Sequence, residues 1–342
     1  MTGSLTPAPV APAADGLVRL ESVALRGHRA DRSAQGKETV AVTTRRRGLL
    51  AFLLMSFGVS WAGMFGARAL GYSLVNPLVQ LLVIAFVPAL AAVAVRAWVT
   101  REGFADAGLR PRLAAAWPSY LAALLGPPGL TAATLALAAA LGLWRPDLSA
   151  LDTMVPGLPG WLAVVLLVGA MPLLAPIYWG EEFGWTSYLR MRICPGRPLA
   201  ATAATGLIWA VWHYPLAFLG YIDFTNVALG LAVWTVSFML QEVILTWLWM
   251  TSGTVWSASL WHAGNNMVLA LLNGVVLTQA GGIDDVVVML LANVPMAALC
   301  AWIVLSGRMR GLPPRPLSPP PAVALGTPAS PQEAGQRAGR GS

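Results

Sequence analysis

The sequence predicts an all-α, polytopic integral membrane protein with about eight transmembrane helices and a disordered tail at each end. Hydrophobic residues make up 57% of the 342-residue chain and charged residues only 11%, whereas soluble domains are roughly 25% charged. Apolar runs of about 20 residues, the length that crosses a bilayer as a helix, fill the central part of the chain. The charged residues gather in the tails and in the short segments between these runs.

Composition also restricts the partners and cofactors of the chain. A formal net charge of +7 would suit nucleic acid, but the arginines lie where a membrane protein meets anionic lipid headgroups. We therefore expect membrane lipid and no nucleic acid as a partner. Cys194 and Cys300 are the only cysteines, so we expect neither a disulfide framework nor a cysteine metal cluster.

The two ends differ from the centre in composition. Residues 1–47 are rich in Ala, Pro, Ser, Thr and Arg and show no sustained apolar period, which predicts a disordered cytoplasmic tail. Residues 308–342 are rich in Pro, Gly, Ala and Ser and predict a second disordered tail. The transmembrane domain is therefore expected over residues 48–307.

The apolar runs set the predicted spans. Pro127 and Pro128 are expected to divide the third span, and Pro172 and Pro176 to kink the fourth, because proline removes a helical hydrogen bond. The predicted spans are residues 48–68, 73–98, 116–143, 161–190, 199–220, 227–250, 254–274 and 285–306.

The loops predict the orientation of these spans. Positive residues gather on the cytoplasmic side of a membrane protein. With the N-terminus inside, one side carries Arg101, Arg110, Arg112, Arg190, Arg192 and Arg197, and the other carries Asp147, Asp152, Asp223, Asp284 and Asp285. We therefore predict a multi-pass protein of the plasma or inner membrane with both termini in the cytoplasm.

Five acidic or histidine residues lie within the apolar spans, away from their ends. Glu181 and Glu182 lie in the fourth span, His213 in the fifth, Glu242 in the sixth and His262 in the seventh. A charged side chain at the centre of a bilayer costs about 2.5–3.5 kcal/mol on insertion scales. Such side chains are expected to face the protein interior and one another, and for Glu242 we expect a structural partner or a cavity-lining role.

Helical spacing indicates which of these residues share a face. Trp209 and His213 are four residues apart, as are His262 and Asn266, so each pair lies on one side of its helix. Counted along their helices, Glu181, His213 and His262 reach the same half of the bilayer. We therefore expect them to meet in one cavity.

This set of side chains suits hydrolysis of an amide or an ester. A carboxylate and an imidazole can activate a water, and a second imidazole with a carboxamide can stabilise an oxyanion. Alternatively, Glu181, His213 and His262 could hold Zn²⁺ with an open fourth position. A proton-coupled transporter is a third reading, but it predicts paired broken helices in two related halves, which the sequence lacks.

At these residues the sequence resembles the CAAX-protease and bacteriocin-processing (CPBP, or Abi) family of intramembrane proteases. The family pattern is Glu-Glu-x-x-x-Arg, then aromatic-x-x-x-His, then His-x-x-x-Asn, each on its own helix. Glu181 and Glu182 fill the first motif, Trp209 and His213 the second, and His262 and Asn266 the third. The resemblance covers about residues 155–275.

The resemblance implies an intramembrane endopeptidase that cleaves a membrane-associated or lipidated peptide. Carried over to this chain, it implies that Glu181 and His213 activate the water, and that His262 and Asn266 stabilise the oxyanion. Glu182 would orient these groups, with Trp209 in support. Members are called metallopeptidases, although a metal-free glutamate mechanism is also argued. The absence of an HExxH zinc signature favours the metal-free form here.

One position departs from the family pattern. The arginine of the first motif would fall at Thr186, which can still form a hydrogen bond. Arg190 lies eight residues beyond Glu182, which is too far along one helix for a direct pair. This departure is the best support for the alternative of a non-catalytic membrane scaffold or immunity protein that retains the fold.

Overall fold

A computed structural model describes residues 14–309 of the chain, with side chains from residue 41 onward. Every regular element in this part is helical, which confirms the all-α prediction. The α-helices are α1 (Ala14–Ala69), α2 (Pro77–Gln80), α3 (Val87–Ala94), α4 (Leu113–Ala140), α5 (Gly160–Glu182), α6 (Arg190–Ile193), α7 (Pro198–His213), α8 (Val227–Ser252), α9 (Val255–Gly264), α10 (Leu271–Asn273) and α11 (Asp285–Leu305).

Short segments of tighter or wider helix continue several of these elements. The 3-10 segments are η3 (Ser149–Thr153) and η5 (Tyr214–Ala217). The π-helical segments are η1 (Leu81–Ala85), η2 (Val95–Val99), η4 (Phe183–Leu189), η6 (Asn265–Ala270) and η7 (Gly274–Ala280).

Seven helical stretches in the described part are long and apolar enough to cross a membrane. The chain is thus a multi-pass membrane protein, as predicted. The stretches are Ala41–Ala69, Pro77–Val99, Leu113–Ala140, Gly160–Ile193, Val227–Ser252, Val255–Ala280 and Asp285–Leu305.

The fifth predicted span, residues 199–220, is shorter than expected. Helix α7 has 16 residues and ends at His213, since Pro215 follows within η5 and cannot continue an α-helix. Beyond this end, the Thr225 hydroxyl donates to Asp284 Oδ2 at 3.1 Å. At the other end of the bundle, the Val255 amide donates to Gly108 O at 3.0 Å. Among the described residues, α7 is therefore not one of the seven stretches long enough to cross a membrane.

Helix α4 passes through Pro118, Pro127 and Pro128 without a break, so the predicted division of the third span is wrong. Within a bilayer the helix satisfies its backbone groups better than any irregular segment. The Thr131 hydroxyl donates to Pro127 O at 3.0 Å and adds a local bond at the proline pair. Prolines 172 and 176 lie inside α5, where the expected kink stays a prediction.

The chain divides into two units between Arg47 and Gly48. Residues 14–47 form the first part of α1, and the tail expected over residues 1–47 stays a prediction. No proline occurs between Pro12 and Pro77, and Ala, Leu, Arg and Glu favour helix, so nothing in this stretch stops one. Residues 1–13 and 310–342, which belong to the predicted tails, lie outside the described residues.

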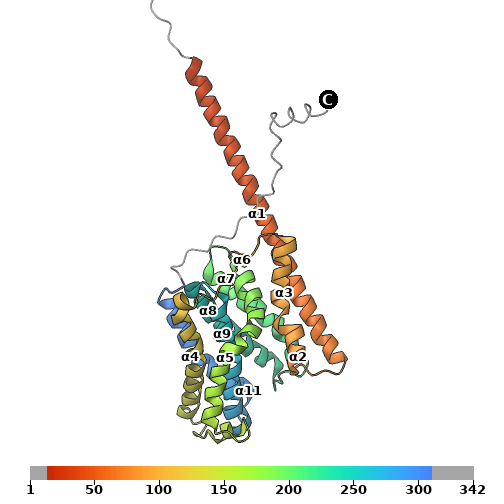
Figure 1. Ribbon diagram of the computed structural model, residues 1–342, viewed down its shortest axis with the longest axis vertical. Coiled ribbons are helices and arrows are strands. Elements are labelled where there is room, and N and C mark those ends of the chain that lie inside the picture. The colour runs from red at the N-terminus through yellow and green to blue at the C-terminus, as the bar shows by residue number, and fades with distance from the viewer. Residues whose placement is uncertain (1–13, 310–342) are drawn as a thin grey trace, which may run out of the picture. The chain divides into compact units, whose positions relative to one another are not determined.

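The second unit is a helical bundle that brings the three motif-bearing segments together. Helix α4 lies beside α11, and α9 packs against both α4 and α5 (Figure 1). Helix α7 packs against α8. The largest fully buried side chains include Trp185, Trp209, Trp212 and Trp261, which lie on η4, α7 and α9. The bulkiest part of the core thus surrounds the ends of α5 and α7.

Candidate active site

Glu181 and Glu182 end helix α5, and the π-helical segment η4 begins at the next residue. The two residues are 6% and 0% exposed. Successive residues of an α-helix point about 100° apart, so the two carboxylates face different neighbours. π-helical turns inside α-helices are frequent at functional sites, and η6, which contains Asn266, is a second one.

Close packing fixes the position of the two glutamates. A Cβ atom at Gly180 would overlap the carbonyl group of Ala85, and one at Gly184 would overlap Pro88. Only glycine lets the end of α5 approach the backbone of η1 and α3 this closely. The end of α5 that carries the two carboxylates is therefore packed closely against η1 and α3.

Glu181 meets the second motif. The Trp209 Nε1–H group donates to Glu181 Oε2 at 2.8 Å, and His213 Nε2 lies 3.9 Å from the same oxygen. His213 Nδ1 lies 3.0 Å from the backbone oxygen of Trp209. Because a carbonyl oxygen only accepts, Nδ1 carries a hydrogen, and the neutral imidazole directs the Nε2 lone pair toward Glu181.

Glu182 meets the third motif. His262 Nδ1 lies 2.9 Å from Glu182 Oε1, and the Thr186 hydroxyl donates to Glu182 Oε2 at 2.6 Å. Asn266 Nδ2 lies 3.5 Å from His262 Nε2. His262 is 2% exposed, whereas Asn266 is exposed. Asn266, the last residue in this chain of contacts, is thus accessible to a reactant.

Aromatic rings join the two halves of the site. The Trp209 ring lies 5.6 Å from the His213 ring and 5.2 Å from the His262 ring, centroid to centroid. Phe238 stacks on His213 at 4.4 Å, and Tyr178 lies 4.8 Å from His262. The structure therefore brings all the expected site residues into one cluster.

Two members of this cluster were not among the residues expected from the sequence. Tyr178 lies four residues before Glu182, and Phe238 lies four residues before Glu242. Each is therefore one helical turn from an intramembrane glutamate and on the same helix face. That spacing was the signal that could have identified them.

Glu242 has a partner in the described structure, in line with the structural role expected for it. Its Oε1 atom lies 4.0 Å from Arg190 Nε, and the Thr246 hydroxyl donates to the same oxygen at 3.3 Å. Both charged side chains are buried, at 0% exposure for Glu242 and 5% for Arg190. Arg190 thus forms an ion pair with Glu242 of α8.

The donor atoms do not form a three-ligand zinc site as they are arranged. Among the residues that the structure describes, no three His, Cys, Asp or Glu side chains are grouped so that they could hold a metal ion. His262 directs Nδ1 at Glu182, and His213 Nε2 remains 3.9 Å from Glu181. The metal-free form favoured from the sequence stays a prediction, with zinc as its alternative.

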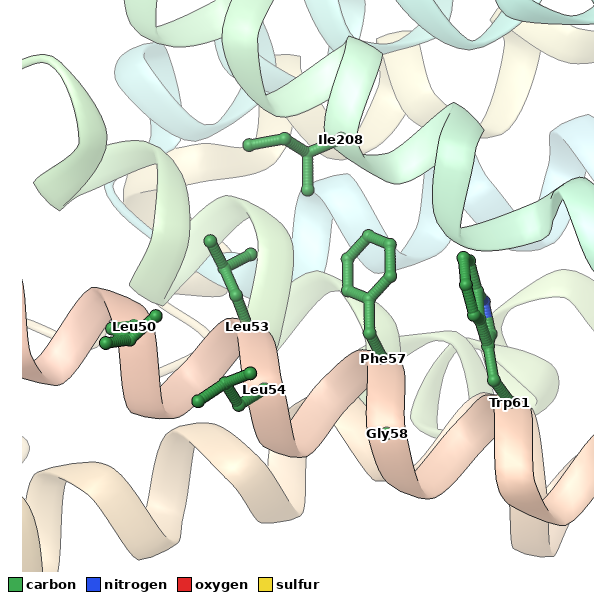
Figure 2. A pocket seen from close by; sticks show the side chains of 7 residues that line it. All are labelled: Leu50, Leu53, Leu54, Phe57, Gly58, Trp61 and Ile208. Atoms are coloured by element: carbon green, nitrogen blue, oxygen red, sulfur yellow. The ribbon is translucent and has the colours of Figure 1, made fainter.

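An apolar groove of about 410 Å³ lies between α1 and α7. Figure 2 shows Leu53 and Phe57 projecting from α1 toward Ile208 of α7. Ile208 directly precedes Trp209, and the groove contains none of the charged site residues. The two helices are joined here by bonds from Trp61 Nε1 to Trp212 O at 2.9 Å and from Trp212 Nε1 to Ser56 O at 3.1 Å.

A comparison with protein families supports the interpretation drawn from the motifs. The family model described as Rce1-like, type II CAAX prenyl endopeptidase, matches residues 156–268. This segment runs from just before α5 into η6 and contains all three motifs. The match confirms the resemblance to the CAAX-protease family over these residues. The searches of curated proteins and of solved structures found no match.

Proposed function

With residues 156–268 matching the Rce1-like endopeptidases, we propose that this chain is an intramembrane endopeptidase. It hydrolyses a peptide bond of a membrane-associated or lipidated peptide. The observation that carries the proposal is the joint burial of two carboxylate–imidazole pairs, Glu181 with His213 and Glu182 with His262, around Trp209. A buried acidic residue in a membrane protein marks a functional site more often than a position that serves only packing.

The first pair suits activation of water. Glu181 Oε2 and His213 Nε2 are 3.9 Å apart, so one water can hydrogen-bond to both atoms. Glu181 takes a proton from this water as the oxygen attacks the carbonyl carbon of the substrate. His213, held through Nδ1 by the Trp209 carbonyl, accepts the second hydrogen bond and orients the nucleophile.

The second pair suits stabilisation of the tetrahedral intermediate. Asn266 Nδ2 and, in the doubly protonated ring, His262 Nε2 both donate to the oxyanion. Glu182 holds His262 through Nδ1. The intermediate then collapses: the carbon–nitrogen bond breaks, and the leaving amine takes the proton held by Glu181. The products are a carboxylic acid and an amine.

The surroundings of the site support a substrate with an apolar anchor. The groove between α1 and α7 is lined by Leu50, Leu53, Leu54, Phe57, Gly58, Trp61 and Ile208. Its volume falls within the range of pockets that bind small apolar ligands. We propose that the substrate reaches the site from the cytoplasmic half of the bilayer and that both termini are cytoplasmic, as the loop charges predict.

Cleavage of membrane-anchored peptides tests the proposal. The purified protein in lipid bilayers would be incubated with a peptide library that is either prenylated, acylated or unmodified. We expect cleavage by the parent and a loss of at least about 10²-fold in Glu181→Ala and His213→Ala. Asp147→Ala removes an exposed loop carboxylate and serves as the matched control. Equal cleavage by all variants would refute the assignment.

Two further outcomes separate the alternatives. Full activity after metal removal with a chelator excludes a zinc requirement, whereas activity that returns only on adding Zn²⁺ establishes one. A parent protein that binds a peptide tightly but leaves it uncut would favour the scaffold or immunity role, to which the threonine at position 186 points.

A further inference from the structure

Helix α7 ends at the residue that carries one of the two imidazoles of the site. His213 is the last residue of α7, and the 3-10 segment η5 begins at the next residue. The last turn of a helix lacks the hydrogen bonds that further helical residues would provide, so its position depends on neighbouring elements. This position sets the 3.9 Å gap between His213 Nε2 and Glu181 Oε2.

Two indole hydrogen bonds attach this last turn to α1. The Trp61 Nε1–H group donates to the backbone oxygen of Trp212 at 2.9 Å, and Trp212 Nε1 donates to the backbone oxygen of Ser56 at 3.1 Å. The two bonds run in opposite directions, so each helix both donates and accepts one. Helix α1 therefore holds the residue next to His213 at its backbone and at its side chain.

Trp212 is in direct contact with His213. Trp212 is fully buried, and its ring centroid lies 4.7 Å from that of the imidazole, in an edge-to-face arrangement at 87°. Phe238 of α8 stacks on the same imidazole at 4.4 Å. Aromatic contacts of these two kinds favour defined ring orientations. The orientation of His213 thus depends on α1, through Trp212, as well as on α8.

General packing between two helices does not explain where these bonds lie. Hydrogen bonds between membrane helices contribute little to stability on average, and apolar contacts anywhere along α1 and α7 would pack the two helices equally well. Helix α1 also precedes residues 156–268, which match the endopeptidase family. Its indole donor nevertheless reaches the carbonyl group directly before His213.

We propose that Trp61 is a positioning residue, which holds the last turn of α7 so that His213 and Glu181 can share one water. The proposal rests on the proposed function, because it assigns Trp61 a role in the same site. Trp61 acts through the Trp212 carbonyl group rather than on the substrate. Its ring also lines the groove between α1 and α7, so one side chain supports His213 and forms part of the apolar surface beside the site.

Removal of a single hydrogen-bond donor tests this role. Trp61→Phe keeps an aromatic ring in the groove and deletes the Nε1–H group, so the Trp212 carbonyl group loses its donor from α1. We expect kcat to fall about tenfold, since a small misplacement of a catalytic group can lower a rate by about 10²-fold. KM should stay within about twofold of the parent value.

Trp247→Phe is the matched control for this substitution. Trp247 Nε1 has no hydrogen-bond partner among the described residues, so the same exchange removes no bond there. We expect kcat of Trp247→Phe to equal that of the parent. An unchanged kcat in Trp61→Phe, or an equal loss in both variants, would contradict the proposal.

A double-mutant cycle shows whether Trp61 acts through His213. In a His213→Ala background the imidazole that Trp61 positions is absent, so Trp61→Phe should change the residual kcat by less than about twofold. A purely structural role of Trp61 would lower kcat by the same factor in both backgrounds. That result would overturn the proposal.

A measurement without substrate separates this proposal from the proposed function. In protein labelled with ¹⁵N-histidine, the ring nitrogen signals report the hydrogen bonds of His213 and His262. We expect Trp61→Phe to shift the signals of His213 and to leave those of His262 in place, whereas Trp247→Phe should shift neither. Unshifted His213 signals would refute the positioning role. Shifted signals in a protein that cleaves no peptide would count against the endopeptidase alone.

Discussion

The structure contains two buried charged clusters that differ in balance and in geometry. The loop cluster consists of Arg96, Arg192, Glu102 and Asp106, and its charges cancel. Its ion pairs are short: Arg96–Asp106 at 2.8 Å, Arg192–Glu102 at 2.9 Å and Arg192–Asp106 at 3.1 Å. The site cluster consists of Glu181, Glu182, His213 and His262, and it leaves a gap of 3.9 Å between Glu181 and His213.

The loop cluster fastens the segment between the second and third spans to the rest of the bundle. The Ser187 hydroxyl donates to Ala107 O at 2.8 Å, and the Thr254 hydroxyl donates to Gly108 O at 3.2 Å. The Arg192 guanidinium lies 4.3 Å above the Tyr188 ring. Comparable burial therefore accompanies two different roles. Balanced, short pairs fix a loop, whereas excess acid with an open gap leaves room for a reactant.

The largest effect is expected from breaking the loop cluster. Asp106→Ala leaves the buried Arg96 and Arg192 with Glu102 as their remaining acidic partner among the described residues. We expect the free energy of unfolding to fall by about 3–5 kcal/mol, as when one member of a buried pair is removed. Denaturant unfolding in detergent micelles measures it.

The matched control lies in the site cluster. Glu181→Gln keeps an oxygen that can accept from Trp209 Nε1, so we expect a stability loss below about 1 kcal/mol together with loss of cleavage. If Glu181→Gln lowers the free energy of unfolding as much as Asp106→Ala does, the two clusters do not differ in role.

A smaller loss of stability is expected at acid pH. Burial alone would raise the pKa of Asp106, but the hydrogen bond and charge of Arg96, together with the charge of Arg192, hold that pKa below its usual value. The resulting stability is fully present above the unfolded pKa of about 3.9 and is lost as the pH falls through the folded value. The difference in unfolding free energy between the parent and Asp106→Asn should therefore shrink below pH 4 or so. A constant difference from neutral to strongly acid pH would contradict this.

Much of the site followed from local spacing. The Trp209–His213 and His262–Asn266 pairs share helix faces because a turn of helix has a fixed length, and intramembrane charges must find one another. The helical class followed for the same reason, since only helices satisfy their backbone within a single segment. None of these conclusions needs knowledge of which helices touch.

The features of the site and the fold that were not predicted depend on packing between helices, which local spacing does not encode. Gly206 lets α7 approach Glu242 and Met239 of α8. The unbroken course of α4 through its prolines was not predicted either, whereas the early end of α7 at His213 follows from the local sequence, since Pro215 cannot continue the helix. Arg96 lies near the end of the predicted span 73–98, but its partners Asp106 and Glu102 are in the following loop, and local spacing does not predict that pairing.

The smallest and sharpest contrast comes from two neighbours on η4, each of which faces one cluster. Thr186 donates to Glu182 at 2.6 Å, and Ser187 donates to the loop at Ala107 O at 2.8 Å. Thr186→Val should lower kcat about tenfold, because a bond to a charged group is worth about 1.5–3 kcal/mol. Ser187→Ala should reduce stability by about 0.5–1.5 kcal/mol and leave kcat unchanged. Parallel kinetics and unfolding of the two variants measure both quantities. If Ser187→Ala lowered kcat as much as Thr186→Val, the fastened loop would be part of the catalytic geometry, and the two clusters would act as one.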